Sequence, residues 1–454
     1  MRQLNAKHLI LAGCLTCSLA LVAGAPQAKA DELSDLKAQI QALTNKVEAL
    51  QAQQKAQATQ MAQQEKAAAP ANAVTAGSVP GSFKLPGTDT SIKIGGYVKV
   101  DGLYHVKGYG NQDFLDTTST PLDGTAAASK KGNTKLDAKQ TRLNVETDTP
   151  TGWGNLKTYV EFDFYGSGGN EQNSNSYGPR LRHAYGELGP FLAGQTDSLF
   201  RDTAAEPETL DFGEDSGLNQ IRQAQFRYTY QAGNGVSAAV SVENPETEYS
   251  TLAGKFRTDT GGTLAFDHLP DLVGALKVKQ SWGHLALRGV ARQLSLNNGT
   301  TTKIHKGAYG IGVSGNLMTF GKDNLLGEFN YGDGIGRYIV DAGGQAAAYN
   351  AATNSLETQT AWGAAIGYQH WWMNNLRSNI SGGYTHIDNN STVFAGCSNA
   401  TCPNKQIETF HINTIWSPIK NFETGIEYIY ARRKVENGAK GKEDTIQVSA
   451  KYKF

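Results

Sequence analysis

The chain ends in the stretch Glu443-Asp-Thr-Ile-Gln-Val-Ser-Ala-Lys-Tyr-Lys-Phe454. From Thr445 onward, polar and apolar residues alternate strictly, which is the pattern of a β-strand with one polar and one apolar face. The segment 154–166 repeats the pattern, with Leu156, Val160 and Phe162 on its apolar side. Strands of this kind separate two environments, one apolar and one wet.

The same alternation recurs back to residue 92 and defines sixteen segments. A single-chain transmembrane barrel needs an even number of strands, and sixteen strands leave a water-filled channel. Beyond residue 25 no run approaches the roughly 18 apolar residues of a membrane helix. The strands are expected at 93–107, 139–149, 154–166, 179–189, 191–199, 220–231, 236–244, 271–282, 284–296, 305–317, 325–332, 358–371, 375–388, 405–417, 421–434 and 443–454.

The connections alternate in length. Short ones such as 150–153 and 233–235 are followed by long polar ones such as 108–138 and 245–270. Outer-membrane barrels combine short periplasmic turns with long external loops, whereas a soluble sandwich has no reason to do so. Five of the six tryptophans lie in or beside short turns, as residues of a membrane interface do. The sequence therefore predicts an all-β fold, a 16-stranded antiparallel transmembrane β-barrel at 91–454, in the bacterial outer membrane.

The N-terminal region has three predicted parts. Residues 1–30 read as a signal peptide, cleaved after Ala30, although Cys14 leaves a lipoprotein signal as an alternative. A short α-helical coiled coil at 31–66 and a flexible linker at 67–90 follow. The coiled coil is expected in the periplasm and implies self-association, unless the helix packs on its own domain. Its heptad seam consists of Leu33, Leu36, Ile40, Leu43, Val47 and Leu50.

Composition excludes some functions. The 454 residues carry 42 basic and 42 acidic side chains, which argues against a nucleic-acid partner. The nine histidines show no catalytic or metal-binding spacing, so we expect no enzyme, no cofactor and no metal. Cys397 and Cys402 flank a short polar segment and are predicted to form a loop disulfide.

Parity places basic side chains on the polar, channel-facing side, where arginine favours anions. The segment 199–219 is long and acidic, and it is predicted to fold inward as a constriction loop that faces these arginines. The alternative is an external acidic loop that binds a divalent cation. The predicted loop residues are Arg201, Asp202, Glu206, Glu208 and Asp211. The predicted pore-lining residues are Arg142, Arg180, Arg182, Arg227, Arg288, Arg292 and Arg377.

Three stretches carry a resemblance to a known family: Lys93-Ile-Gly-Gly-Tyr-Val-Lys-Val-Asp-Gly102, Gln140-Thr-Arg-Leu-Asn-Val-Glu-Thr147 and Leu192-Ala-Gly-Gln-Thr-Asp-Ser-Leu-Phe200. Together with the coiled coil, they make the chain resemble the DcaP-like outer-membrane porins. The terminal Phe454 resembles the assembly signal of exported barrels.

The resemblance implies a homotrimer that takes up small anionic solutes such as dicarboxylates by passive diffusion. Its expected surroundings are outer-membrane lipid and lipopolysaccharide. Two alternatives remain open at this point. One is a phosphate- or anion-selective porin, and the other is an envelope tether whose coiled coil binds peptidoglycan or another periplasmic partner.

Overall fold

The computed structural model describes residues 28–68, 74–169, 171–259 and 263–454. They form two units, of which the first contains helix α1 (Ala28–Ala68). The expected signal peptide lies outside the described residues up to position 27. Among the described residues, no helix has the length and apolar character needed to cross a membrane.

Helix α1 exposes its apolar seam. The side chains of Ile40, Leu43, Val47 and Leu50 are each more than half exposed in the single chain. A helix this polar on its remaining faces gains little from packing unless the stripe meets a partner. The helix is present as the sequence predicts, and its association into a coiled coil stays a prediction.

The second unit is a closed barrel of sixteen antiparallel strands, which confirms the fold prediction. Each expected segment corresponds to one strand, with boundaries shifted by a few residues. The strands are β2 (Ser91–Lys107), β4 (Arg142–Thr151), β5 (Gly154–Ser167), β6 (Gly178–Leu188), β7 (Phe191–Asp197), β8 (Arg222–Gly233), β9 (Val236–Glu243), β12 (Asp271–Gln280), β13 (Gly283–Asn297), β14 (Lys303–Met318), β15 (Asn324–Asp333), β18 (Thr360–Met373), β19 (Leu376–Asp388), β20 (Asn404–Trp416), β21 (Phe422–Val435) and β22 (Lys440–Lys453).

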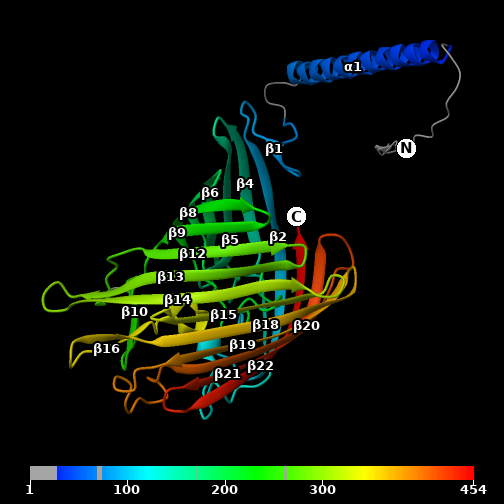
Figure 1. The fold of residues 1–454 in the computed structure, drawn as a ribbon. Helices are drawn as coiled ribbons and strands as arrows, with labels where there is room; N and C mark the ends of the chain where they lie inside the picture. Colours follow the sequence, from blue (N-terminus) through cyan, green and yellow to red (C-terminus); the bar gives the residue numbers. More distant parts are fainter. Residues whose placement is uncertain (1–27, 69–73, 170, 260–262) are drawn as a thin grey trace. The chain divides into compact units, whose positions relative to one another are not determined.

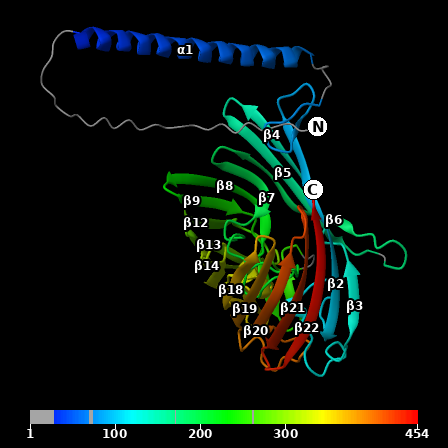
Figure 2. The ribbon, with the colours of Figure 1, turned by 90° about the vertical axis from the view of Figure 1, so that its right-hand side faces the viewer.

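The barrel closes between its first and last strands. Strand β2 pairs antiparallel with β22 from Tyr97 opposite Lys453 to Lys107 opposite Asp444. Figure 2 shows these two strands side by side, and Figure 1 shows β12 to β22 following one another around the wall. Closure removes the free sheet edges that could not be tolerated in hydrocarbon.

The two faces of the wall differ as the alternation predicts. In β22 the side chains of Ile446, Val448 and Tyr452 are exposed on the outer face, whereas Thr445 and Gln447 are buried on the inner face. The pattern extends to β13, where outward leucines alternate with inward arginines. The outer band is therefore apolar, as a lipid-facing surface requires.

Several short elements were not expected. Strands β1 (Phe83–Lys84) and β3 (Asn133–Asp137) add to the main sheet, so part of the predicted linker 67–90 is ordered against β2. The remaining short strands form a separate four-stranded sheet built from long loops. These are β10 (Glu248–Thr251), β11 (Gly254–Arg257), β16 (Ala347–Asn350) and β17 (Ser355–Thr358). Three 3-10 turns also lie in the long loops: η1 (Thr117–Ser119), η2 (Gly336–Tyr338) and η3 (Val340–Ala342).

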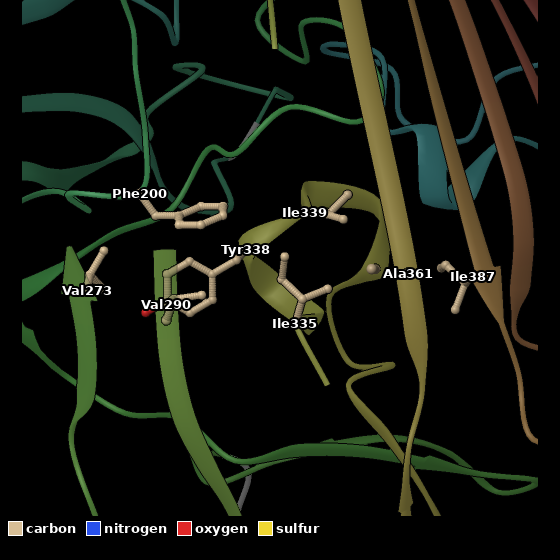
Figure 3. Close-up of a cluster of buried hydrophobic side chains, with 9 residues drawn as sticks. Phe200, Val273, Val290, Ile335, Tyr338, Ile339, Ala361 and Ile387 are labelled. Carbon is tan, nitrogen blue, oxygen red and sulfur yellow. The ribbon is translucent and has the colours of Figure 1, made fainter. Parts of the chain in front are cut away.

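Part of the barrel interior is packed rather than wet, which the sequence analysis did not anticipate. Phe200 and Tyr338 meet edge to face with ring centroids 5.5 Å apart. Inward residues of the wall, including Val273, Val290 and Ile387, complete this buried apolar cluster (Figure 3). Because Phe200 and Tyr338 belong to different long loops, the cluster fixes two inward-folded segments to one side of the barrel.

Candidate channel constriction

The segment between β7 and β8, residues 198–221, lies against the inner face of the barrel. Its first acidic residue, Asp202, accepts hydrogen bonds from Lys277 at 2.9 Å and from Ser314 at 2.7 Å, and it contacts His284 at 2.7 Å. Burial acts to raise the pKa of Asp202, but the hydrogen bonds from Ser314 and Lys277 outweigh it and hold the pKa at about 2. Asp202 is therefore an anionic anchor on strands β12 to β14.

A second anchor lies further around the wall, on strand β19. Arg377 of β19 donates to both carboxylate oxygens of Glu208, at 2.6 and 2.7 Å. The carbonyl of Glu208 accepts from Asn413 at 2.9 Å. A two-point contact of this kind sets position as well as energy. Arg377 is thus largely engaged by the segment and is not free to meet a solute.

The tip of the segment reaches the first and last strands. Lys99 of β2 and Gln447 of β22 both donate to the carbonyl of Leu210, at 2.7 and 2.9 Å. The amide of Leu210 donates to Glu427 at 2.6 Å. Asp211 accepts from the amides of Leu115 and Gly213 instead of facing the channel. These contacts join wall strands, a first long loop and the segment itself.

Glycines of the wall provide the seat for this segment. A Cβ at Gly383 would lie 2.2 Å from the carbonyl oxygen of Ser216, and one at Gly363 would lie 2.7 Å from the Cα of Gly217. A Cβ at Gly367 would lie equally close to Pro207. Strand glycines commonly mark such close backbone approach. The glycines were visible in the sequence, but nothing local to them indicated what they would contact.

Asp341 connects this segment to two other parts of the barrel. Its buried carboxylate accepts from the Ser216 hydroxyl at 2.6 Å, the Gly217 amide at 2.9 Å and the Thr385 hydroxyl at 2.6 Å. It also accepts from the hydroxyl of Thr117. Four donors from a wall strand and two loops therefore converge on one residue of a third loop. No sequence signal marked Asp341, because its partners are distant along the chain.

Arg201 of the segment pairs with acids of the segment itself and of the preceding strand β7. Arg201 donates to both oxygens of Glu206, at 2.6 and 2.8 Å, and to Asp197 at 3.1 Å. Burial raises the pKa of the Glu206 carboxyl to about 7, with Arg201 opposing the rise. The prediction that these acids face an arginine cluster across the channel is therefore wrong, because they bind groups beside them.

The side of the barrel opposite β12 to β21 carries three arginines that form ion pairs with only two acidic residues. Arg182 contacts Glu161 and Asp163, each at 2.9 Å, while Arg180 contacts Asp163 at 2.6 Å and Arg142 contacts Glu161 at 3.6 Å. The side chain of Arg180 is 35% exposed, whereas that of Asp163 is fully buried. The basic group of Arg180 is thus more exposed than the acid that holds it, whereas Arg182 and its partner Glu161 are both buried.

Phe212 brings the tip of the segment to this arginine wall. Its ring stacks on Tyr165 at 4.5 Å and meets Phe114 at 5.4 Å. The Arg180 guanidinium lies 5.3 Å from both the Phe212 and the Tyr165 rings. An isolated aromatic residue in an acidic loop was a signal that the sequence analysis passed over.

Two further arginines belong to the same wall. Arg227 donates to the carbonyl of Asp197 at 2.7 Å. Arg222, which the sequence analysis did not select, lies 3.7 Å from the Asp197 carboxylate and within electrostatic reach of Arg182 and Arg201. The lumen is therefore bordered by basic groups on one side and by the inward segment on the other.

Arg288 and Arg292 do not line the open lumen, and that part of the prediction is wrong. Their side chains are 1% and 0% exposed. Arg288 pairs with Glu328 at 3.1 Å and donates to the carbonyl of Phe200, and Arg292 donates to the carbonyl of Ile335 at 3.1 Å. They face inward, as parity indicates, but the folded loops cover them.

Three other predictions concern the disulfide, the C-terminal residue and the alternative role of the acidic segment. Cys397 and Cys402 are joined by a disulfide in the long loop between β19 and β20. Phe454 follows β22, and its role as an assembly signal stays a prediction. The segment 198–221 contacts the inner face of the barrel wall, which contradicts the alternative of an external cation-binding loop. Within the residues that the structure describes, no group of three or more His, Cys, Asp or Glu side chains could hold a metal ion.

Comparison with known proteins places this barrel among outer-membrane channels and porins. The model of the family described as DcaP outer membrane protein matches residues 20–454, and the chain belongs to this family. The crystal structure of the outer membrane channel DcaP of Acinetobacter baumannii has the same fold, with a TM-score of 0.69 at 24% identity over 80% of this chain and 97% of that one.

The curated relatives align with a smaller share of this chain. Porin Omp2b of Brucella suis is 27% identical over 235 residues, which is 49% of this chain and 57% of the relative. Porin Omp2b of Brucella neotomae is 26% identical over 295 residues, 62% of this chain and 74% of the relative. The chain thus spans between about half and three quarters of the length of these relatives.

Replacing Asp341 tests how firmly the segment is held. Asp341→Ala leaves four buried donors without their acceptor, so we expect a loss of about 3 kcal/mol in the free energy of unfolding. Urea unfolding of the refolded barrel, followed by tryptophan fluorescence, measures it. Asp341→Asn keeps one acceptor oxygen and should lose less. Equal stability of the alanine variant and the unchanged protein would contradict this role.

The raised pKa of Glu206 predicts a pH-dependent lumen charge. Glu206 is negative above its pKa of about 7 and neutral below it. Lowering the pH from about 8 to about 6 therefore makes the lumen more positive and should raise the chloride-to-potassium permeability ratio by up to about fivefold. Reversal potentials in a planar bilayer measure this ratio.

The control is Glu206→Gln, which is neutral throughout this range. Most of the pH response should be lost in the variant, and its ratio at high pH should match that of the unchanged protein at low pH. A full response in Glu206→Gln would assign the titration to another group.

Proposed function

We propose that this barrel is a porin for passive diffusion of small hydrophilic solutes and that it favours small anions such as dicarboxylates. The observation that carries the proposal is the placement of charge at the constriction. Basic side chains of β4, β6 and β8 border the lumen, while Asp202 and Glu208 of the inward segment are held by the wall beside them. The negative charges of these acids therefore offset the field of the basic side chains only weakly.

One cluster of that wall has a positive charge balance. Arg142, Arg180 and Arg182 share two carboxylates, those of Glu161 and Asp163, which leaves one net positive charge. A narrow passage with low-dielectric walls strengthens the field of such a charge over its value in bulk water. Neighbouring guanidinium groups also suit a solute with two carboxylates, because each arginine can pair with one of them.

Removing arginines tests the proposal. The double variant Arg142→Ala and Arg180→Ala should lower the chloride-to-potassium permeability ratio by about fivefold or more, a change equivalent to about 1 kcal/mol. Reversal potentials across a bilayer with a potassium chloride gradient give this ratio. Arg257→Ala is the matched control, since Arg257 lies in β11 of the loop sheet and is exposed. Cation preference in the unchanged protein would refute the anion-guided proposal.

We further infer that helix α1 assembles the protein as a homotrimer, with the coiled coil in the periplasm. The support is the exposed stripe of Ile40, Leu43, Val47 and Leu50, which one helix cannot bury alone. A function as an envelope tether is the competing explanation of the same exposed stripe, with peptidoglycan or a periplasmic protein as partner.

Deleting residues 31–66 distinguishes these explanations. Assembly through the coiled coil predicts that the deleted form loses trimers on native gels while each barrel still conducts. The matched control is a full-length chain in which Gln41, a residue outside the seam, is replaced by Glu; it should stay trimeric. If the deleted form remains trimeric and conducts normally but cells shed outer membrane, the helix acts as a tether.

A further inference from the structure

An apolar groove lies on the outer face of the barrel, outside the channel. It crosses strands β13, β14, β15, β18 and β19 and has a volume of about 710 Å³. This volume is in the range of small-molecule sites rather than of packing defects. The walls of the groove are outward apolar side chains: Leu285, Val313, Leu325, Phe329, Ile366 and Tyr384.

Glycines form the floor of the groove. Gly315 of β14 and Gly327 of β15 are direct cross-strand partners, and Gly382 of β19 lies opposite Ile366 of β18. All three occupy outward positions that elsewhere in the barrel carry aliphatic side chains. Their missing side chains lower the surface by the length of a side chain, while Val313 and Phe329 rise beside it. The result is a slot open to the membrane.

The groove leads to one rim of the barrel. Its lining includes Leu317, which is next to the short turn between β14 and β15. Around this rim Trp282, Met318 and Phe320 are exposed, and aromatic residues of this kind lie at the headgroup level of a membrane. Short turns of outer-membrane barrels face the periplasm, so this rim belongs to the periplasmic leaflet.

We propose that this groove binds the acyl chain of a phospholipid of the periplasmic leaflet. Hydrocarbon surrounds the outer face of the barrel, and an empty slot there would forfeit dispersion contacts along its whole length. An acyl chain is thin and flexible enough to follow a floor of glycines. Its headgroup would lie at the rim, where the aromatic side chains end.

The turn at this rim also carries a basic residue. Lys322 is exposed, donates one hydrogen bond to Asn374 at 2.9 Å and lies 5.4 Å from the centre of the Trp371 ring. An ammonium group carries three donors, so Lys322 retains two for a phosphate. A second copy of this chain is the competing occupant, but a side chain from a neighbouring barrel would need no path to the headgroup level.

Native mass spectrometry of the full-length protein in mild detergent tests the proposal, with phosphatidylethanolamine as the added probe. We expect one phospholipid to stay bound to each chain. Ala364→Phe and Gly382→Leu each fill the groove from a different strand, and a Cβ at Gly382 meets only the Thr409 carbonyl at 3.3 Å. The lipid concentration for half occupancy should rise about tenfold in each variant, the weakening expected when about two methylene groups leave the groove.

Gly289→Leu is the matched control. Gly289 is an outward glycine of β13 away from the groove, and a Cβ there would approach only the Gly310 carbonyl, at 3.9 Å. This variant should bind lipid like the unchanged protein. The proposal is overturned if both filling variants retain lipid as well as the control does. It is also overturned if the unchanged protein retains none, or if the filling variants separate the oligomer into single barrels without affecting bound lipid.

Discussion

The pairing of β2 with β22 is the constraint on which the rest of the structure depends. Hydrocarbon offers no hydrogen bonds to a free sheet edge, so a spanning sheet must return to its own first strand. Once the sheet is closed, the alternation of side chains assigns each residue to the lipid or to the interior. Gln447 and Ser449 show the effect, because they are buried on the inner face between outward Ile446, Val448 and Ala450. The lumen and its charges exist only because this seam is made.

Within that interior, acidic residues act mainly as anchors. An ionised carboxylate away from water is costly unless it is paired. Asp202, Glu208 and Asp341 meet this requirement by binding wall residues or loop donors, and in doing so they fix the inward segment. Acidic side chains that the sequence predicts to face the channel are thereby neutralised by the groups beside them. The arginines of the opposite wall also pair with acids, but Arg180 keeps a larger exposed fraction than its partner Asp163.

The sequence allowed the wall to be predicted in detail and the interior only in part. Alternation with a period of two is a local property, so all sixteen strands could be located from it. Strand parity also placed Arg288 on the inner face. Parity contains no information about what covers that face, and the carbonyl of Phe200 comes from a loop 88 residues away along the chain. The four donors around Asp341 pose the same difficulty, because their convergence depends on how three separate segments fold together.

The shallow placement of Arg180 has a consequence for the surroundings in which the barrel works. A charge that keeps contact with water is screened by dissolved ions, and the screening length falls from about 30 Å at 0.01 M salt to about 3 Å at 1 M. The buried pair of Arg288 and Glu328 is shielded from this effect, so salt should leave the inner scaffold intact. Any discrimination between anions and cations by the exposed Arg180 guanidinium should instead weaken at high salt concentration and be strongest at low salt concentration.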